Sequence, residues 1–282
     1  MPIRSYLYAP GNRPDLLAKV AGRGADAIIL ELEDAVPAAE KARACEIASE
    51  FLAAGPPVPA FVRINGGIAG PDDIARLDVR GLFGVLVPKA EGAGLIQAID
   101  RALAERERIA GRETGGVMIQ PLIETVAGLY GLDAIAGASP RIRRVGFGAG
   151  DFVRDLRAQP TEARTETLYA RMRLVARCRF LRLEPPVAHV FSRIRDLEGL
   201  RRACLEDRAL GFQARSCIHP SQVAVVNEAF GPSAEEVGRA RSVLAAYADA
   251  TAAGRGSLLL DDGTFIDEAV ALRAQDMLRQ AL

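Results

Sequence analysis

Eight short apolar runs, each followed by a stretch with helical periodicity, recur along the first 230 residues of this chain. Short runs of this kind, bounded by glycine, proline or polar residues, are typical of buried parallel strands. The expected strands are 6–9, 26–31, 59–63, 83–89, 117–123, 144–148, 186–190 and 213–218. The expected helices are 14–23, 37–53, 71–77, 93–109, 125–136, 165–182, 196–210 and one that starts at 220. Eight strand–helix pairs in order predict an α/β protein with a (β/α)8 TIM barrel rather than an open doubly wound sheet.

The pattern changes after Phe230. There the sequence predicts a helix, a short strand pair around the turn Asp261-Asp-Gly263, and a last helix, over 233–253, 257–260 with 264–266, and 267–281. We therefore expect a barrel catalytic domain over 1–230 and a C-terminal extension over 231–282. The extension is expected to pack on the barrel or on a neighbouring subunit.

Composition excludes several classes of function. The chain has 36 basic and 36 acidic residues, so it offers no electrostatic case for binding nucleic acid or an anionic membrane. The four cysteines show no CxxC spacing, which argues against a disulfide framework or a zinc site. No GxGxxG follows the first strand, and no apolar run approaches the ~18 residues of a membrane span. The N-terminus lacks a signal-peptide core, so we expect a cytoplasmic protein.

Two carboxylates follow neighbouring strands of the expected barrel. Glu124 comes directly after the fifth strand and Asp151 after the sixth. The carboxyl ends of barrel strands form the rim where such enzymes carry their chemistry. Two carboxylates there repel each other unless a cation lies between them, and Mg²⁺ commonly takes one or two carboxylates plus waters. The alternative is that Asp151 caps a helix that begins at Phe152.

Other residues at the same rim are candidates for binding substrate. Arg63 ends the third strand, where its cation can bind a substrate carboxylate or a developing oxyanion. The alternative is an ion pair with an acidic residue at the next strand end, namely Glu31, Glu33 or Asp34. The amides from Gly150 onward can hold a carboxylate. Lys89 is the one lysine at a strand end, either as a Schiff-base nucleophile or as a charge partner for the acidic rim.

Some polar residues are expected to have no catalytic role. Arg141, Arg143 and Arg144 precede the sixth strand, at the opposite rim, and are expected to form a solvated cluster. His219 lies at a strand–helix junction and is expected to be a structural hydrogen-bonding residue. No Ser–His–acid arrangement is recognisable, so a hydrolase triad is not supported.

Seven ordered motifs carry a resemblance to a known family. They are Arg4–Pro14, Leu32–Val36, Val62–Asn65, Val87–Lys89, Pro121–Thr125, Gly148–Asp151 and Ile218–Gln222, and further matches at Gly254–Gly256 and Asp262–Asp267 extend them to nearly the whole chain. Together they resemble the citrate lyase beta subunit family, which includes malyl-CoA and citramalyl-CoA lyases, within the wider HpcH/HpaI aldolase group.

The resemblance implies a fold, a cofactor and a reaction. It implies a (β/α)8 barrel, a divalent metal that is usually Mg²⁺, and trimers or dimers of trimers. The reaction it implies is cleavage or formation of a carbon–carbon bond in a 3-hydroxyacyl thioester, which gives acetyl-CoA or a relative plus a 2-oxo acid. The expected partners are therefore a CoA thioester, a 2-oxo acid and further copies of the chain.

The resemblance also implies roles for individual residues. Glu124 and Asp151 match the metal ligands, which together with Gly150 also contact substrate, and Arg63 matches the substrate-contacting arginine. Asp267 matches an acid/base aspartate that many members deliver from the C-terminal segment of a neighbouring subunit. On the residues alone, Asp267 is equally an N-cap of the last helix.

The sequence departs from the family pattern in three places. Glu31 stands where an aspartate is usual, Arg215 where a lysine is usual, and 187–192 differs from the usual end of strand seven. The acyl preference is therefore open. We expect a magnesium-dependent lyase for a short-chain 3-hydroxyacyl-CoA such as malyl-CoA or citramalyl-CoA. The alternatives are a citrate lyase beta-like subunit acting on an acyl-carrier thioester, a CoA thioester hydrolase on the same metal site, and, last, a Schiff-base aldolase using Lys89.

Overall fold

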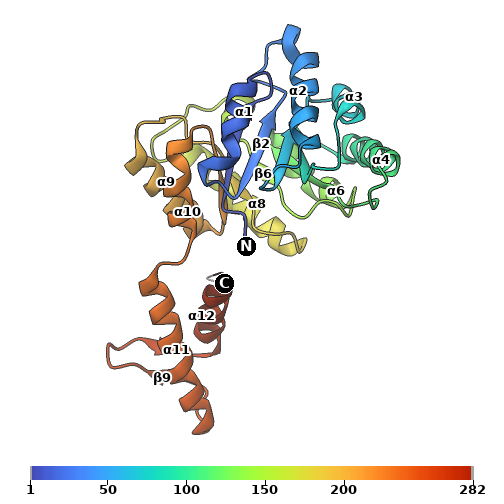
Figure 1. The fold of residues 1–282 in the computed structure, drawn as a ribbon. Helices are drawn as coiled ribbons and strands as arrows, with labels where there is room; N and C mark the ends of the chain where they lie inside the picture. Colours follow the sequence, from blue (N-terminus) through green and yellow to red (C-terminus); the bar gives the residue numbers. More distant parts are fainter. Residues whose placement is uncertain (1, 281–282) are drawn as a thin grey trace. The chain divides into compact units, whose positions relative to one another are not determined.

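Eight strands pair in parallel and in chain order, and the last strand pairs with the first, in the computed structural model of the protein, which describes residues 2–280 (Figure 1). The strands are β1 (Ser5–Pro10), β2 (Ala27–Glu31), β3 (Ala60–Arg63), β4 (Gly84–Val87), β5 (Met118–Ile123), β6 (Gly146–Phe147), β7 (Val187–Ala188) and β8 (Ala214–Cys217). The predicted (β/α)8 barrel is confirmed.

Helices follow each strand and surround the barrel (Figure 1). The α-helices of this part are α1 (Pro14–Val20), α2 (Lys41–Ala53), α3 (Ala69–Arg76), α4 (Ala93–Ile109), α5 (Val126–Tyr130), α6 (Leu132–Ala136), α7 (Ala149–Asp155), α8 (Leu168–Phe180), α9 (Leu197–Leu210) and α10 (Val223–Phe230). Short 3₁₀ turns, η1 (Ala21–Arg23), η2 (Ala38–Glu40), η3 (Thr165–Thr167) and η4 (Pro220–Gln222), adjoin α1, α2, α8 and α10. The single helix predicted over 125–136 is interrupted at Gly131.

Apolar side chains from seven of the strands fill the barrel interior. The cluster consists of Tyr6, Ala27, Ile29, Phe61, Leu86, Leu122, Val187 and Ala214. Tyr6 and Phe61 pack edge to face with ring centroids 5.4 Å apart. Gly84 provides the space for Phe61, because a Cβ at that position would lie 2.6 Å from the Phe61 ring. The interior is therefore a packed core, and ligands reach the barrel only at its ends.

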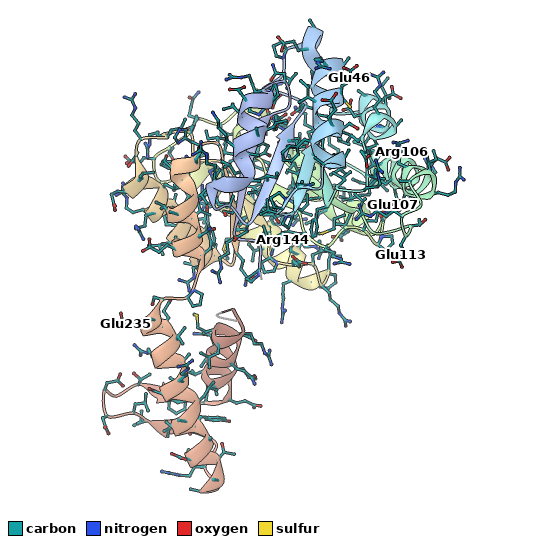
Figure 2. The ribbon with its side chains drawn as sticks, viewed as in Figure 1. Glu46, Arg106, Glu107, Glu113, Arg144 and Glu235 are labelled. Atoms are coloured by element: carbon teal, nitrogen blue, oxygen red, sulfur yellow. The ribbon has the colours of Figure 1, made fainter. Side chains whose placement is uncertain are left out.

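The amino-terminal end of the barrel is held by buried arginines. Arg141 is 4% exposed and pairs with Glu107 at 2.7 Å, and Glu107 is itself fully buried. Glu107 comes from α4 and is labelled in Figure 2. Arg144, 5% exposed, donates to the carbonyl of Ile3 at 3.0 Å and to the hydroxyl of Tyr6 at 3.2 Å. The prediction that these arginines are solvated is wrong for Arg141 and Arg144, since each satisfies its charge inside the fold.

The chain divides into two compact units, residues 3–226 and residues 227 onward. In the second unit, α11 (Ala234–Ala252) and α12 (Glu268–Gln280) flank a two-stranded hairpin of β9 (Leu258–Leu259) and β10 (Phe265–Ile266). A small core of Ala240, Val243, Ile266 and Ala274 holds this unit together. The predicted end of the last helix at Ala281 lies outside the described residues, as do Met1 and Leu282. That the unit packs on a neighbouring subunit stays a prediction.

None of the helices in the described part of the chain combines the length and the apolar character needed to cross a membrane.

Candidate active site

The carboxyl-terminal rim of the barrel gathers the charged residues that the sequence singled out. Glu31 and Arg63 end β2 and β3 and are register partners across the two strands. Glu124 follows β5, and Asp151 lies in the first turn of α7, directly after β6. The expectation that these strand ends share one rim is met because all eight strands run in parallel around a closed barrel.

Arg63 is held by three carboxylates. Its Nε lies 2.5 Å from Glu31, its Nη2 lies 3.2 Å from Asp34, and its Nη1 lies 3.3 Å from Glu33. Burial lowers the pKa of Arg63, but the Glu31 and Glu33 carboxylates raise it by more, so the net direction is upward. The ion pairs expected for Arg63 are therefore present. A guanidinium has five N–H donors; Glu31 and Asp34 accept from two of them, and the Glu33 contact is an ion pair without a hydrogen bond.

Tyr8 adds a contact that the sequence did not indicate. The Arg63 guanidinium lies over the Tyr8 ring at 5.5 Å from its centroid. Burial raises the pKa of Tyr8, so its hydroxyl stays protonated. Tyr6 and Tyr8 share one face of β1, and their period-two spacing is a signal that could have placed Tyr8 toward the barrel axis, although Tyr8 was not among the predicted site residues.

Lys89 is a charge partner for the rim, as one of its two interpretations predicted. Its Nζ lies 2.8 Å from Glu33 and 3.9 Å from Asp151. Burial lowers the pKa of Lys89, but the hydrogen bond to Glu33 and the surrounding carboxylates outweigh it and raise the pKa above its usual value. A Schiff base requires a neutral amine, so this environment opposes the nucleophilic interpretation.

Glu124 is the most perturbed acid of the rim. It is 4% exposed, and its Oε1 accepts a hydrogen bond from the backbone N–H of Lys89 at 2.8 Å. Burial raises its pKa to about 7, and the Asp151 carboxylate also raises it, while the Lys89 amide acts in the opposite direction. A strongly perturbed carboxyl beside a second carboxylate is typical of a functional site. A bound cation is the partner that would keep both groups ionised.

Asp151 does not cap a helix that begins at Phe152. Helix α7 begins at Ala149, and its N-cap residue, Gly148, makes no side-chain cap. Asp151 instead lies in the first turn, 24% exposed, with its Oδ1 3.0 Å from Arg154. The helix starts earlier than predicted because β6 ends at Phe147 and leaves Gly148 to make the turn. The amide of Gly150 is among the first N–H groups of this helix.

Gly148 fits closely against Glu124. A Cβ at position 148 would lie 2.5 Å from the Cβ of Glu124 and still closer to its Oε2. Oε2 of Glu124 therefore faces the turn into α7, the helix that carries Asp151. The match of Gly148–Asp151 to a family motif was a signal for this turn, but its role in accommodating Glu124 was missed.

The donor set fits Mg²⁺ better than a transition metal. In the described part of the chain, no three or more His, Cys, Asp or Glu side chains are grouped closely enough to hold a metal ion. The two candidate ligands, Glu124 and Asp151, are both carboxylates. This hard oxygen donor set, with open positions for waters and a ligand, is the kind by which proteins hold Mg²⁺.

A cavity of about 510 Å³ adjoins the rim beside α2 and α3. Glu33 lines it and also contacts Arg63 and Lys89, so this side chain connects the cavity to the rim network. The remaining lining residues are Ala38, Lys41, Ala42, Asn65, Gly66, Ala69, Asp72, Asp73 and Arg76.

Asp267 lies in the second unit and caps α12. Its Oδ1 accepts a hydrogen bond from the backbone N–H of Val270 at 3.0 Å. The N-cap interpretation is therefore confirmed, whereas the acid/base role stays a prediction. His219 likewise has a structural role, since its Nδ1 accepts from the backbone N–H of Ser221.

Comparison with known proteins finds relatives that match over nearly the whole chain. The chain is 34% identical to a citrate lyase subunit beta-like protein of Deinococcus radiodurans, with 98% of this chain and 96% of that protein covered. It is also 34% identical to an L-malyl-CoA/beta-methylmalyl-CoA lyase of Cereibacter sphaeroides, with 99% and 95% covered. The crystal structure of CitE from Mycobacterium tuberculosis in complex with magnesium, acetoacetate and coenzyme A superposes with a TM-score of 0.77 at 30% identity, covering 99% of this chain and 97% of that one.

The family model described as HpcH/HpaI aldolase/citrate lyase matches residues 4–220, which span the strands and nearly all the helices of the barrel. The chain belongs to the HpcH/HpaI aldolase/citrate lyase family.

Proposed function

We propose that this protein is a Mg²⁺-dependent carbon–carbon lyase. Its substrate would be a short-chain 3-hydroxyacyl-CoA, such as malyl-CoA or citramalyl-CoA, cleaved to or formed from a 2-oxo acid and acetyl-CoA. The observation that carries the proposal is the pair Glu124 and Asp151 at neighbouring strand ends, with Arg63 at the same rim. The magnesium and coenzyme A named for the related CitE structure and the lyase name of the Cereibacter relative support it.

Glu124 and Asp151 would hold the metal ion. When bound, Mg²⁺ supplies a positive charge that lowers the pKa of a substrate hydroxyl and polarises a carbonyl oxygen. Oε1 of Glu124 already accepts the Lys89 amide, so Oε2, which faces Gly148, is the oxygen available for coordination. Burial of Glu124 strengthens its attraction to a cation, since little water screens the pair.

Arg63 would orient the substrate carboxylate. The contact with Glu31 fixes the plane of its guanidinium, and the Tyr8 ring supports one face. Its free N–H donors can then bind a carboxylate oxygen in a fixed direction, which holds the bond to be broken at one place on the rim. The amide of Gly150, at the positive end of α7, would hold a second oxygen.

A proton must be exchanged with the thioester enolate. We assign this role to Asp267 of a neighbouring subunit in a homotrimer or hexamer, working in the cytoplasm. In the cleavage direction its carboxyl would protonate the enolate carbon, and in the reverse direction its carboxylate would remove the α-proton.

Replacement of Asp151 tests the proposal. Asp151→Ala should abolish Mg²⁺ binding, measured by isothermal titration, and cleavage of a panel of malyl-, citramalyl-, methylmalyl- and citryl-CoA. Asp133→Ala is the matched control, because Asp133 also lies in the first turn of a short helix and pairs with an arginine, but at an exposed site. Cleavage that survives in Asp151→Ala, or that EDTA does not affect, contradicts the proposal.

Product analysis separates the rival functions. A lyase acting on malyl-CoA releases glyoxylate and acetyl-CoA, whereas a thioester hydrolase releases malate and free CoA. Turnover of acyl-carrier thioesters alone would indicate a citrate lyase beta-like subunit. Borohydride trapping of a 2-oxo acid on Lys89 would indicate a Schiff-base aldolase.

A further inference from the structure

Lys89 has a backbone conformation that residues with side chains rarely adopt. Its φ is +48°, in the left-handed region. The other non-glycine residues with positive φ in the described chain are Arg157, Arg164 and Arg182. Lys89 is the member of this set that contacts the candidate site. Such strain at an active rim is retained when the resulting geometry is useful.

The left-handed turn redirects one amide of the chain. β4 ends at Val87 in register with Pro121 of β5, and the next residue, Pro88, has no N–H to donate. The amide of Ala90 returns to β5 by donating to the carbonyl of Leu122 at 3.3 Å. Between them, the amide of Lys89 is free of the strand ladder and donates to Oε1 of Glu124 at 2.8 Å.

The side chain of Lys89 connects two other segments of the rim. Its ammonium lies 2.8 Å from Glu33, after β2, and 3.9 Å from Asp151, in α7. One residue therefore contacts three carboxylates that come from three different parts of the sequence. Without a cation among them, these carboxylates would repel one another at short range.

We propose that Lys89 is the positioning residue of the metal site. Its backbone N–H fixes Glu124 through Oε1 and leaves Oε2 toward Gly148 and α7. Its ammonium holds Glu33 back from the metal position and places a counter-charge beside Asp151. The inference rests on the proposed function, because the metal that Glu124 and Asp151 would bind is the one proposed there. Outer contacts of this kind fix the direction of a ligand oxygen before the metal arrives.

Substitutions at position 89 separate the amide from the ammonium. Asparagine and glycine enter the left-handed region readily, so Lys89→Asn and Lys89→Gly remove the ammonium but keep the turn. Valine is β-branched and strongly disfavours that region, so Lys89→Val removes both features. Lys89→Arg keeps a positive charge and completes the set.

Mn²⁺ binding to the purified full-length variants, followed by electron paramagnetic resonance, is the measurement. We expect Lys89→Val to bind Mn²⁺ at least about tenfold more weakly than Lys89→Asn and Lys89→Gly, with a changed spectrum of the bound ion, because outer contacts typically affect metal affinity by about 10- to 100-fold. Equal affinity and equal spectra for Lys89→Val, Lys89→Asn and the unchanged protein would overturn the proposal.

Amide hydrogen exchange tests the same contact without any change at position 89 and without a metal. We expect Glu124→Ala to speed exchange of the Lys89 amide, while Glu124→Gln, which keeps an acceptor oxygen, preserves most of the protection. An exchange rate that is the same in all three proteins overturns the positioning role. Absence of Mn²⁺ binding by the unchanged protein, together with a protected Lys89 amide, would instead contradict the proposed function and leave the positioning of Glu124 standing.

Discussion

Asp207 of α9 and Arg215 of β8 form an ion pair in which neither residue is exposed to solvent. The same carboxylate also pairs with Arg164 at 3.0 Å and with Arg171 at 2.8 Å. Burial raises the pKa of Asp207, but Arg215 and the other cationic groups lower it by more, so the carboxyl is held ionised. Three guanidinium groups thus depend on one carboxylate between β8 and the helices outside it.

Removal of that charge should destabilise the barrel strongly. We expect Asp207→Asn to lower the free energy of unfolding by about 3–5 kcal/mol, because breaking a buried pair leaves buried charge uncompensated. The matched control is Asp133→Asn, since the pair of Asp133 with Arg177 is exposed and such pairs contribute about 0–1 kcal/mol. Urea denaturation followed by circular dichroism measures both, and equal effects would contradict the argument.

His189 should give the protein an acid-sensitive stability. Its pKa is lowered to about 3, mainly by burial; Arg215, Arg164 and Arg171 contribute to this lowering, and Asp207 opposes it. In the unfolded chain its pKa is near the ordinary value of about 6.5. Between these values the unfolded state binds the extra proton, so the contribution of His189 is complete above about pH 6.5 and is lost progressively as the pH falls toward 3.

The measurement for this prediction is the free energy of unfolding as a function of pH. His189→Gln should flatten the slope between about pH 6.5 and 4. Asp207 does not produce this slope. Its pKa is lowered in the folded protein, so the stability that it contributes is lost only as the pH falls below the ordinary pKa of an aspartate, near 3.9. The same slope in both proteins would exclude His189 as its origin.

We expect that Gly148 cannot be replaced by a residue with a side chain, whereas Gly150 can. In Gly148→Ala the new methyl group would overlap Glu124, so we expect the Glu124 carboxylate to move and metal affinity to fall at least about tenfold. Apart from the adjacent residues and the backbone of α7 itself, no atom lies within 4 Å of the position that a Cβ would occupy at Gly150, so Gly150→Ala should keep the fold and the metal affinity. Isothermal titration with Mg²⁺ compares them, and an unaffected Gly148→Ala would show that Glu124 can move without loss.

Asp267 combines a cap with the proposed acid/base role, and two substitutions separate these roles. Serine is an N-cap residue without a carboxyl, so Asp267→Ser should keep the stability of α12, whereas Asp267→Ala should lose about 1 kcal/mol. If Asp267 exchanges the proton, both variants lose activity equally. If Asp267→Ser instead keeps nearly the activity of the unchanged protein, and only Asp267→Ala loses both stability and activity, then Asp267 acts only as an N-cap. Thermal unfolding and turnover of the preferred thioester are the two measurements.

The strand ends were predictable because their signal is local. Arg63 and Glu124 each end an apolar run, and parallel strands bring such ends together whatever the sequence between them. The start of α7 was not predictable to the residue, since Gly148 and Gly150 on either side of Ala149 disfavour a helix and the turn depends on how β6 ends. A predicted cap at Asp151 was wrong for that reason.

Contacts between distant segments were the other limit. Arg141 and Arg144 lie in a run of basic residues that is typical of a solvated surface, and nothing adjacent in sequence shows that Glu107 or Ile3 meets them. The turn at Lys89 could not be predicted from the sequence for the same reason. The amide of Lys89 donates to Glu124, 35 residues later in the chain, and only the folded barrel brings the two residues together.

The pairing of β1 with β8 has a consequence for how the chain is made. It joins Ser5 to Arg215, so the sheet cannot close during synthesis until nearly the whole barrel sequence has left the ribosome. Until then, β1 presents an open edge with unpaired backbone groups, which is a known route to aggregation. We expect nascent chains that end before residue 214 to depend on chaperones, although they already contain Arg63, Glu124 and Asp151. The candidate site residues of this chain are therefore translated early, and the strand that closes the barrel is the last of its strands to be translated.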